Sequence, residues 1–190
     1  MKIHEMSKKN ILLLAGVLLL GLSLVVGSSR AFAKSAKEID VSVEVALDRF
    51  KHEVGGAEEY LANAKGVLVI PNVYRVGFFL GAEYGEGALL IDGKTVDYYS
   101  LAAGSFGLQF GGQSKNVVVI FMEDNALTKF RDSLGWKGGV DGSVVLVDLG
   151  AGTSVDSNNV QHPIVGFVFG LKGLMVNLSL EGSKFTKLIK

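Results

Sequence analysis

The chain contains no cysteine and only two prolines among its 190 residues. Without cysteine it forms no disulfide, so its apolar core alone must stabilise the fold. Histidine is nearly as scarce, and beyond residue 33 only His52 and His162 remain. Metal sites built from Cys and His, and catalytic triads built on His, are therefore not expected.

The sequence also lacks a nucleotide-binding fingerprint, although "GFFLGAEYGEG" at residues 77–87 is rich in glycine. Its spacing is G-x-x-x-G-x-G instead of G-x-G-x-x-G, and a strand and a turn are predicted where the fingerprint requires a helix. Glu83 and Glu86 would also repel a phosphate. The "GSFG" stretch at 104–107 lacks the strand-to-helix elbow of G-x-S-x-G enzymes. We therefore predict a protein that is not an enzyme and that uses no cofactor or metal.

A short apolar run, residues 11–27, follows a basic segment and precedes the small-residue triplet "AFA" at 31–33. This order is typical of a secretory signal peptide, and we predict cleavage after Ala33. The alternative is an uncleaved anchor, although the run is shorter than the roughly 20 residues that span a bilayer. We expect an exported protein, periplasmic or secreted, with a single domain over residues 34–190.

The charge of this domain argues against nucleic acid as a partner. Four of the 19 basic residues and one of the 19 acidic residues lie in the predicted leader, which leaves the mature chain with a net charge of −3. Proteins that bind nucleic acid through phosphate contacts instead present an excess of Lys and Arg.

Apolar periodicity predicts helices at the start of the domain. Ser35 and Glu38 form a capping box, and apolar residues then recur at helical spacing until Gly55 and Gly56 end the pattern. A shorter helical segment carrying Tyr60 follows. The first of these helices is amphipathic, so one face must pack against the rest of the domain.

From residue 66 the apolar period changes to two, which predicts short antiparallel strands. The predicted strands are "GVLVIP", "VGFFLGAE", "GALLI", "TVDYYSL", "SFGLQFG", "NVVVIFM", "GSVVLVDLG", "IVGFVFGL" and "GLMVNLSLEG". One helix interrupts them, where Leu127, Phe130 and Leu134 share a face and Gly135 follows the helix end. The predicted fold class is α+β: an antiparallel sheet with an N-terminal amphipathic helix and one or two further short helices.

Three of these strands place bulky residues on one face and glycine on the other. The glycines concerned are at positions 77, 81, 107, 111, 166 and 170. A glycine within a strand costs about 0.5–1 kcal/mol relative to alanine, so the six cost roughly 3–6 kcal/mol against a net domain stability of about 5–15 kcal/mol. Tight curvature, or close approach of another backbone or a helix, would offset this cost. We therefore expect a glycine-rich, strongly curved, barrel-like sheet whose bare face is covered by the N-terminal helix.

In the order and spacing of its glycines the chain resembles the SYLF domain family. The stretches that carry the resemblance are "AKGVLVIPNVYRVGFFLGAEYGEGALL", "GSFGLQFGGQSKNVVVIFMEDNALTKF" and "LKGLMVNLSLEGSKF". The resemblance implies binding to phospholipids, especially to anionic head groups, and, in fungal and animal members, to actin filaments. Because an exported protein does not meet actin, the implied partner here is a phospholipid or a membrane surface.

In some members of this family an N-terminal amphipathic helix contacts the membrane. Residues 34–54 here carry four basic and five acidic side chains, whereas a helix that lies on a membrane has a basic polar face. The composition therefore favours a helix that packs on the sheet.

The candidate lipid-binding residues lie elsewhere in the chain. Basic candidates are Lys65 and Arg75, which flank the first strand, and Lys184, Lys187 and Lys190 at the C-terminus. Four such groups near an anionic surface provide roughly 4 kcal/mol, which corresponds to only millimolar binding. Apolar insertion or an acyl-binding cavity must add the rest.

Phe79 is the apolar candidate of this set, and the other aromatic candidates for an interface are Tyr74, Tyr98, Tyr99 and Trp136. Packing in the core is the alternative role for each of them. For the whole protein, the alternative to lipid binding is a structural or protein-interaction module that recruits a partner in the cell envelope.

Overall fold

The computed structural model describes residues 34–77, 80–106, 111–148, 162–172, 180 and 182–190. The helices are α2 (Ala36–Glu53), α3 (Ala57–Asn63) and α4 (Asp124–Asp132), and the strands are β1 (Gly66–Gly77), β2 (Leu80–Ile91), β3 (Lys94–Phe106), β4 (Gly111–Phe121), β5 (Trp136–Lys137), β6 (Val145–Asp148), β7 (Ile164–Lys172) and β8 (Lys184–Leu188). The predicted leader, residues 1–33, lies outside the described residues, as does most of the predicted last strand at 173–182. No helix within the described residues is both long enough and apolar enough to cross a membrane.

Helix α2 begins at the predicted capping box. The Ser35 hydroxyl accepts a hydrogen bond from the backbone N–H of Glu38, and the Glu38 carboxylate accepts one from the backbone N–H of Ser35 at 2.7 Å. Both bonds satisfy N–H groups that a helix start otherwise leaves open. The helix ends before Gly55 as predicted, and α3 follows at the predicted second helical segment.

The strands form one eight-stranded sheet in the order β5-β8-β3-β2-β1-β4-β7-β6. All neighbours are antiparallel except β6 and β7, which are parallel. A parallel pair needs a long connection, and the chain between these two strands provides one. The predicted α+β class is thus confirmed, with one parallel pair at the edge.

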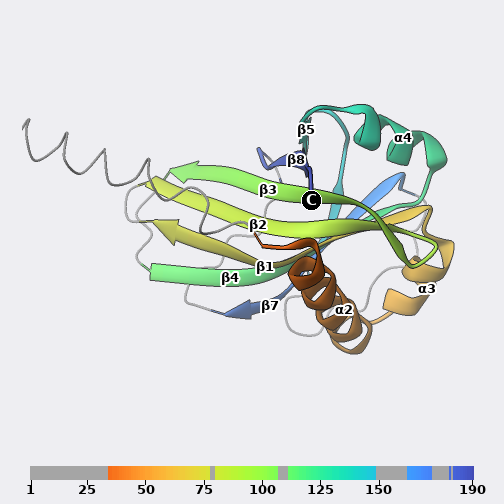
Figure 1. The fold of residues 1–190 in the computed structure, drawn as a ribbon, viewed down its shortest axis with the longest axis horizontal. Helices are drawn as coiled ribbons and strands as arrows, with labels where there is room; N and C mark the ends of the chain where they lie inside the picture. Colours follow the sequence, from red (N-terminus) through yellow and green to blue (C-terminus); the bar gives the residue numbers. More distant parts are fainter. Residues whose placement is uncertain (1–33, 78–79, 107–110, 149–161, 173–179, 181) are drawn as a thin grey trace, which may run out of the picture. The chain divides into compact units, whose positions relative to one another are not determined.

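The sheet has to curl, because a short segment joins its two edges. Strands β5 and β6 lie at opposite ends of the strand order, and a flat sheet would hold them about 34 Å apart at roughly 4.8 Å per strand. The chain from Lys137 to Val145 reaches at most about 29 Å. The sheet is accordingly a half-barrel, as predicted from its glycines (Figure 1).

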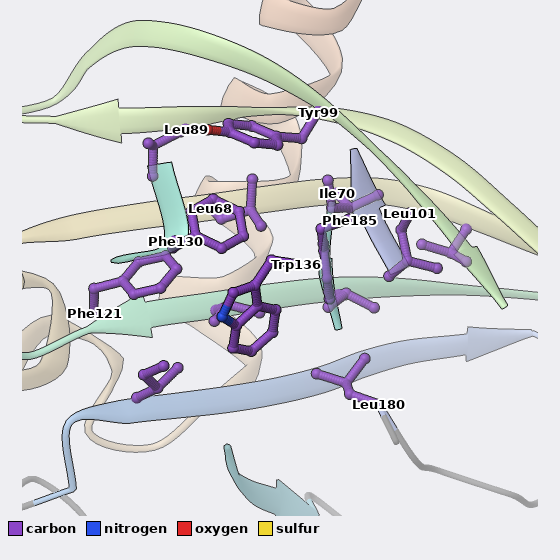
Figure 2. Close-up of a cluster of buried hydrophobic side chains, with 14 of the residues drawn as sticks. Leu68, Ile70, Leu89, Tyr99, Leu101, Phe121, Phe130, Trp136, Leu180 and Phe185 are labelled. Carbon is purple, nitrogen blue, oxygen red and sulfur yellow. The ribbon is translucent and has the colours of Figure 1, made fainter. Parts of the chain in front are cut away.

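Each face of the sheet carries its own apolar core. We call the outer face the one on which α2 and α3 pack, where Phe50 of α2 contacts Phe167 of β7 with ring centroids 5.0 Å apart. The inner face is enclosed by α4 and by side chains from both sheet edges, with Trp136 of β5 next to Phe130 and Phe185 (Figure 2). Because both edges contribute to the inner core, the inner face is concave and the outer face is convex.

The expectation that α2 covers the glycine face of β7 is met at Gly170, where an added side chain would meet Arg49 of α2, and is wrong at Gly166. Phe167 and Phe169 point toward α2, whereas a side chain at Gly166 would meet Val144 and Leu146 on the inner face. The helix packs where bulky side chains provide the most apolar area to bury.

The prediction for the helix after β4 was also wrong at its end. Leu134 was expected to share its face with Leu127 and Phe130, but α4 ends at Asp132 and Leu134 is 96% exposed. Sequence patterns place helix ends less reliably than helices themselves.

The glycines of β2 allow the backbone of β1 to approach closely. A β-carbon at Gly87 would clash with the carbonyl oxygen of Val69 and lie 2.7 Å from the Cα of Ile70, and one at Gly85 would lie 2.9 Å from Val73. This close approach of another backbone involves Gly85 and Gly87, which are not among the six glycines for which it was predicted.

We predict that Gly87→Ala destabilises the domain by about 1–3 kcal/mol, the usual cost of overpacking, because its methyl group would meet backbone that cannot move aside. The matched control is Gly104→Ala in β3, where an added β-carbon has no neighbour within 4 Å. Urea unfolding measures both variants. Equal stability of the two would show that the close approach at Gly87 is not a constraint.

Candidate functional site

Tyr74 of β1 and Tyr84 of β2 lie directly opposite each other, and both are about half exposed, at 59% and 48%. Directly paired residues of antiparallel strands have their side chains on the same face. Val73 belongs to the inner core, so its neighbour Tyr74 points to the outer face. Figure 1 shows β1–β4 continuing past α2.

The pairing register extends these two tyrosines into a row across the outer face. From β7 to β5 the row is Lys172, Ser114, Tyr74, Tyr84, Ala102, Lys184 and Lys137. A second row beside it contains Gly112, Val76, Ala82 and Gly104. We call these two rows together the tyrosine face; it has lysine at both ends and no acidic residue.

Small residues surround the two rings. On a sheet, neighbouring side chains usually cover an aromatic ring, but Ala82, Ala102 and Gly104 offer little or no side chain. Val76 in the second row is 62% exposed. The result is an uncovered apolar surface on the convex side of the sheet.

A buried acid fixes the orientation of Tyr84. The Tyr84 hydroxyl donates a hydrogen bond of 2.7 Å to Glu86, whose second carboxylate oxygen lies 3.0 Å from the Lys190 ammonium. Partial burial, and then the hydrogen bond to Glu86 and its negative charge, raise the pKa of Tyr84 to about 12. Tyr84 therefore remains a neutral phenol at physiological pH.

The inner face of the same strands is charged. One carboxylate oxygen of Glu83 lies 2.8 Å from the Lys115 ammonium, and the other lies 3.5 Å from the Nε of Arg75. All three side chains are buried. The pairs join β1, β2 and β4 directly beneath the tyrosine face. Breaking a buried pair by removing one partner costs several kcal/mol, so these contacts hold the three strands in register.

Lys65, Arg75 and Phe79 do not form one surface in the described structure. Lys65 is exposed at the start of β1, roughly 30 Å along the strand from Tyr74 at about 3.3 Å per residue. Arg75 is buried on the inner face and pairs with Glu83. Phe79 lies outside the described residues.

The three C-terminal lysines differ in their surroundings. Lys187 pairs with Asp97 at 2.6 Å, and Lys190 is nearly buried against Glu86. Lys184 is exposed and has no ion pair with a described residue. Of the three, only Lys184 lies on the tyrosine face.

The aromatic candidates also differ in how far they are exposed. Tyr99 and Trp136 are buried in the inner core, and Tyr98 is partly buried, with its hydroxyl donating to Asp40 of α2 at 2.9 Å. Tyr74 is the one of these four that is exposed. Core packing is thus the role of Tyr99 and Trp136.

Sequence reasoning did not single out Tyr84, Val76 or Lys172 as site residues. Tyr84 and Glu86 are two residues apart in a strand and therefore share a face, which is a usable signal. The pairing of Tyr74 with Tyr84 did not follow from the sequence, because residues 76–83 were predicted as one strand. The structure instead pairs Val76 with Ala82 across two antiparallel strands, β1 and β2, so that prediction was wrong. No feature of the sequence pointed to Lys172.

The described residues also line two pockets. One, of about 230 Å³, lies between α4 and the start of β7 and includes Lys129, Trp136, Asp141 and His162. The other, of about 360 Å³, lies between α2, α3 and the β2–β3 turn. Within the described part of the chain, no three His, Cys, Asp or Glu side chains come together as a metal site.

Residues 102–188 match the family model described as Ysc84, Las17-binding protein actin regulator. No curated protein matches the chain. The matched segment includes both ends of the tyrosine face, with Lys172, Gly112, Ala102 and Lys184, but not the two central strands that carry the tyrosines. Over residues 102–188 the match is consistent with the resemblance of the glycine pattern to the SYLF domain family.

Proposed function

We propose that this protein is a non-catalytic, exported phospholipid-binding protein of the cell envelope, and that it docks on the membrane surface through the tyrosine face. The observation that carries the proposal is the pair Tyr74–Tyr84, uncovered on a convex sheet surface and flanked by Lys172 and Lys184. Tyrosine is enriched where membrane meets water, because its ring is apolar and its hydroxyl polar.

The size of the exposed apolar surface suits reversible binding. About 100 Å² of each tyrosine, at roughly 25 cal/mol per Å², provides about 2–3 kcal/mol per ring. Each lysine near an anionic surface adds about 1 kcal/mol. The two tyrosines and two lysines together reach about 7 kcal/mol, which corresponds to a dissociation constant on the order of 10 µM. Charge alone would give a far weaker interaction.

The alternative is a structural or protein-interaction module that uses the same surface to bind an envelope protein. An exposed apolar patch marks protein interfaces as well as membrane sites. Neither row of the tyrosine face contains an acidic residue, and the neighbouring Glu86 is buried and paired with Lys190. Together with the lysines at the ends of the face, this favours an anionic surface over an ordinary protein partner.

We predict that Tyr74→Thr combined with Tyr84→Thr abolishes binding to phosphatidylglycerol vesicles in a flotation assay at low salt. Threonine keeps the strand propensity but removes the rings, so the fold remains while at least a hundredfold in affinity is lost. Binding of the wild-type protein is expected to weaken, but persist, with phosphatidylcholine vesicles.

The control for this experiment is Val45→Thr combined with Leu134→Thr, which removes exposed apolar side chains outside the tyrosine face. This variant should float like the wild-type protein. If the wild-type protein fails to float with either lipid, the lipid-binding proposal is wrong and the protein-interaction alternative stands. If both variants lose binding equally, the membrane contact is not the tyrosine face.

A second prediction concerns charge. Lys172→Glu and Lys184→Glu should each weaken binding to phosphatidylglycerol vesicles roughly fivefold or more and flatten its salt dependence, since each lysine faces the lipid head groups. Lys129→Glu, an exposed position on α4, should have no effect. Titration of vesicles at two salt concentrations measures this. An equal loss in the Lys129 variant would mean that net charge, and not the tyrosine face, governs binding.

A further inference from the structure

The larger of the two pockets has the size of a ligand site. Its volume of about 360 Å³ falls within the roughly 300–1,000 Å³ of small-molecule sites, whereas the pocket beside α4 is smaller. Three leucines belong to the apolar part of its lining, Leu47 from α2, Leu61 from α3 and Leu90 from β2, and polar atoms form the rest. These leucines are only partly buried at the margin of the outer core, so the core leaves apolar side chains uncovered here.

Two charged side chains stand at the rim of this pocket. Lys51 of α2 is exposed and forms no ion pair with any described residue. Asp92 lies across the rim in the β2–β3 turn, where its φ of 50° fits the left-handed position that Asp or Asn takes before glycine. The turn accounts for Asp92. Lys51 lies in the last turn of α2, where a cation also suits the helix dipole.

We infer that this pocket binds the alkyl chain of a single-chain anionic amphiphile whose head group lies against Lys51. The leucine side chains suit a hydrocarbon chain, and the flexible ammonium of Lys51 suits a carboxylate or a phosphate. The pocket is separate from the tyrosine face. Val67, which lines the pocket, and Tyr74, which belongs to the tyrosine face, are roughly 23 Å apart along β1 at about 3.3 Å per residue. A fatty acid and a lysophospholipid share the required chemistry.

The test is calorimetric titration of the purified protein with single-chain amphiphiles below their critical micelle concentrations. Dodecanoate represents the fatty acid and lysophosphatidylglycerol the lysophospholipid, while dodecyl maltoside and dodecyltrimethylammonium supply a neutral and a cationic head. We expect saturable binding of at least one anionic ligand, stronger than that of the other two. The anionic ligand that binds more tightly shows whether the site prefers a fatty acid or a lysophospholipid. No saturable binding of either, or equal binding of dodecyl maltoside, would overturn the inference.

Variants at the rim assign the binding to this pocket. Lys51→Glu should weaken binding of the anionic ligand roughly threefold to tenfold, and Asp92→Asn, which preserves the turn, should strengthen it. Lys37→Glu makes the same charge change at an exposed position near the other end of α2 and should have no effect. Ala62→Trp, at an exposed wall position, should block the groove without disturbing the core. Unchanged binding in both Lys51→Glu and Ala62→Trp would place the ligand elsewhere and overturn the inference.

The two proposed sites can be tested independently of each other. The variant with threonine at positions 74 and 84 should lose vesicle binding and keep amphiphile binding, whereas Ala62→Trp should do the opposite. If Ala62→Trp also loses vesicle binding, the pocket and not the tyrosine face contacts the membrane; that result would contradict the proposed docking surface and leave the amphiphile site standing.

Discussion

A β-bulge in β1, between Val69 and Tyr74, determines which side chains lie on each face of the sheet beyond it. Val69 pairs with Ala88 and Tyr74 with Tyr84, so β1 contains one residue more than β2 between these pairs. The register against β4 shifts by one residue over the same stretch, between Ile70 and Val73. Because side chains alternate with a period of two, one extra residue exchanges the two faces beyond it. Without the bulge Tyr74 would point into the half-barrel and Arg75 outward.

Several neighbours make the bulge possible. Asn72 takes a φ of 51°, which asparagine tolerates better than most residues, and its backbone N–H donates to the buried side chain of Asn116 at 3.1 Å. Gly85 and Gly87 leave room for the displaced backbone of β1. Beyond the bulge, the pairs of Glu83 with its two cations hold the exchanged register, since a slip back would expose these charges and bury the rings. Glu83, Gly85 and Gly87 are alternate residues of β2, so the glycines and the ion pairs both lie on the inner face, beneath the tyrosine face.

The sequence predicted the parts of this structure that depend on local pattern. The capping box at Ser35, the change to a period of two at residue 66 and the curvature implied by glycine all follow from neighbouring residues. The bulge does not: the predicted first strand ends at Pro71, and the residues after it continue β1 only through their pairing with β2 and β4. Strand β8 was missed for a similar reason: "KFTKL" is short and polar and becomes a strand only by pairing with β3. For the candidate site, Lys184 was predicted as a charge, but its place in a row with the tyrosines depends on that same pairing.

Curvature and the row of side chains together explain how a flat bilayer would meet this sheet. On a convex face the middle of the row protrudes and its ends recede. Tyr74 and Tyr84 lie on the two central strands of the row, while Lys172 and Lys184 lie on strands toward its ends. The rings would therefore enter the interface first, and the long lysine side chains would extend back to the head groups, as lysine does at membrane surfaces. The short segment between β5 and β6 forces the sheet to curl. It therefore also determines the convex shape of the outer face, on which the tyrosine face lies.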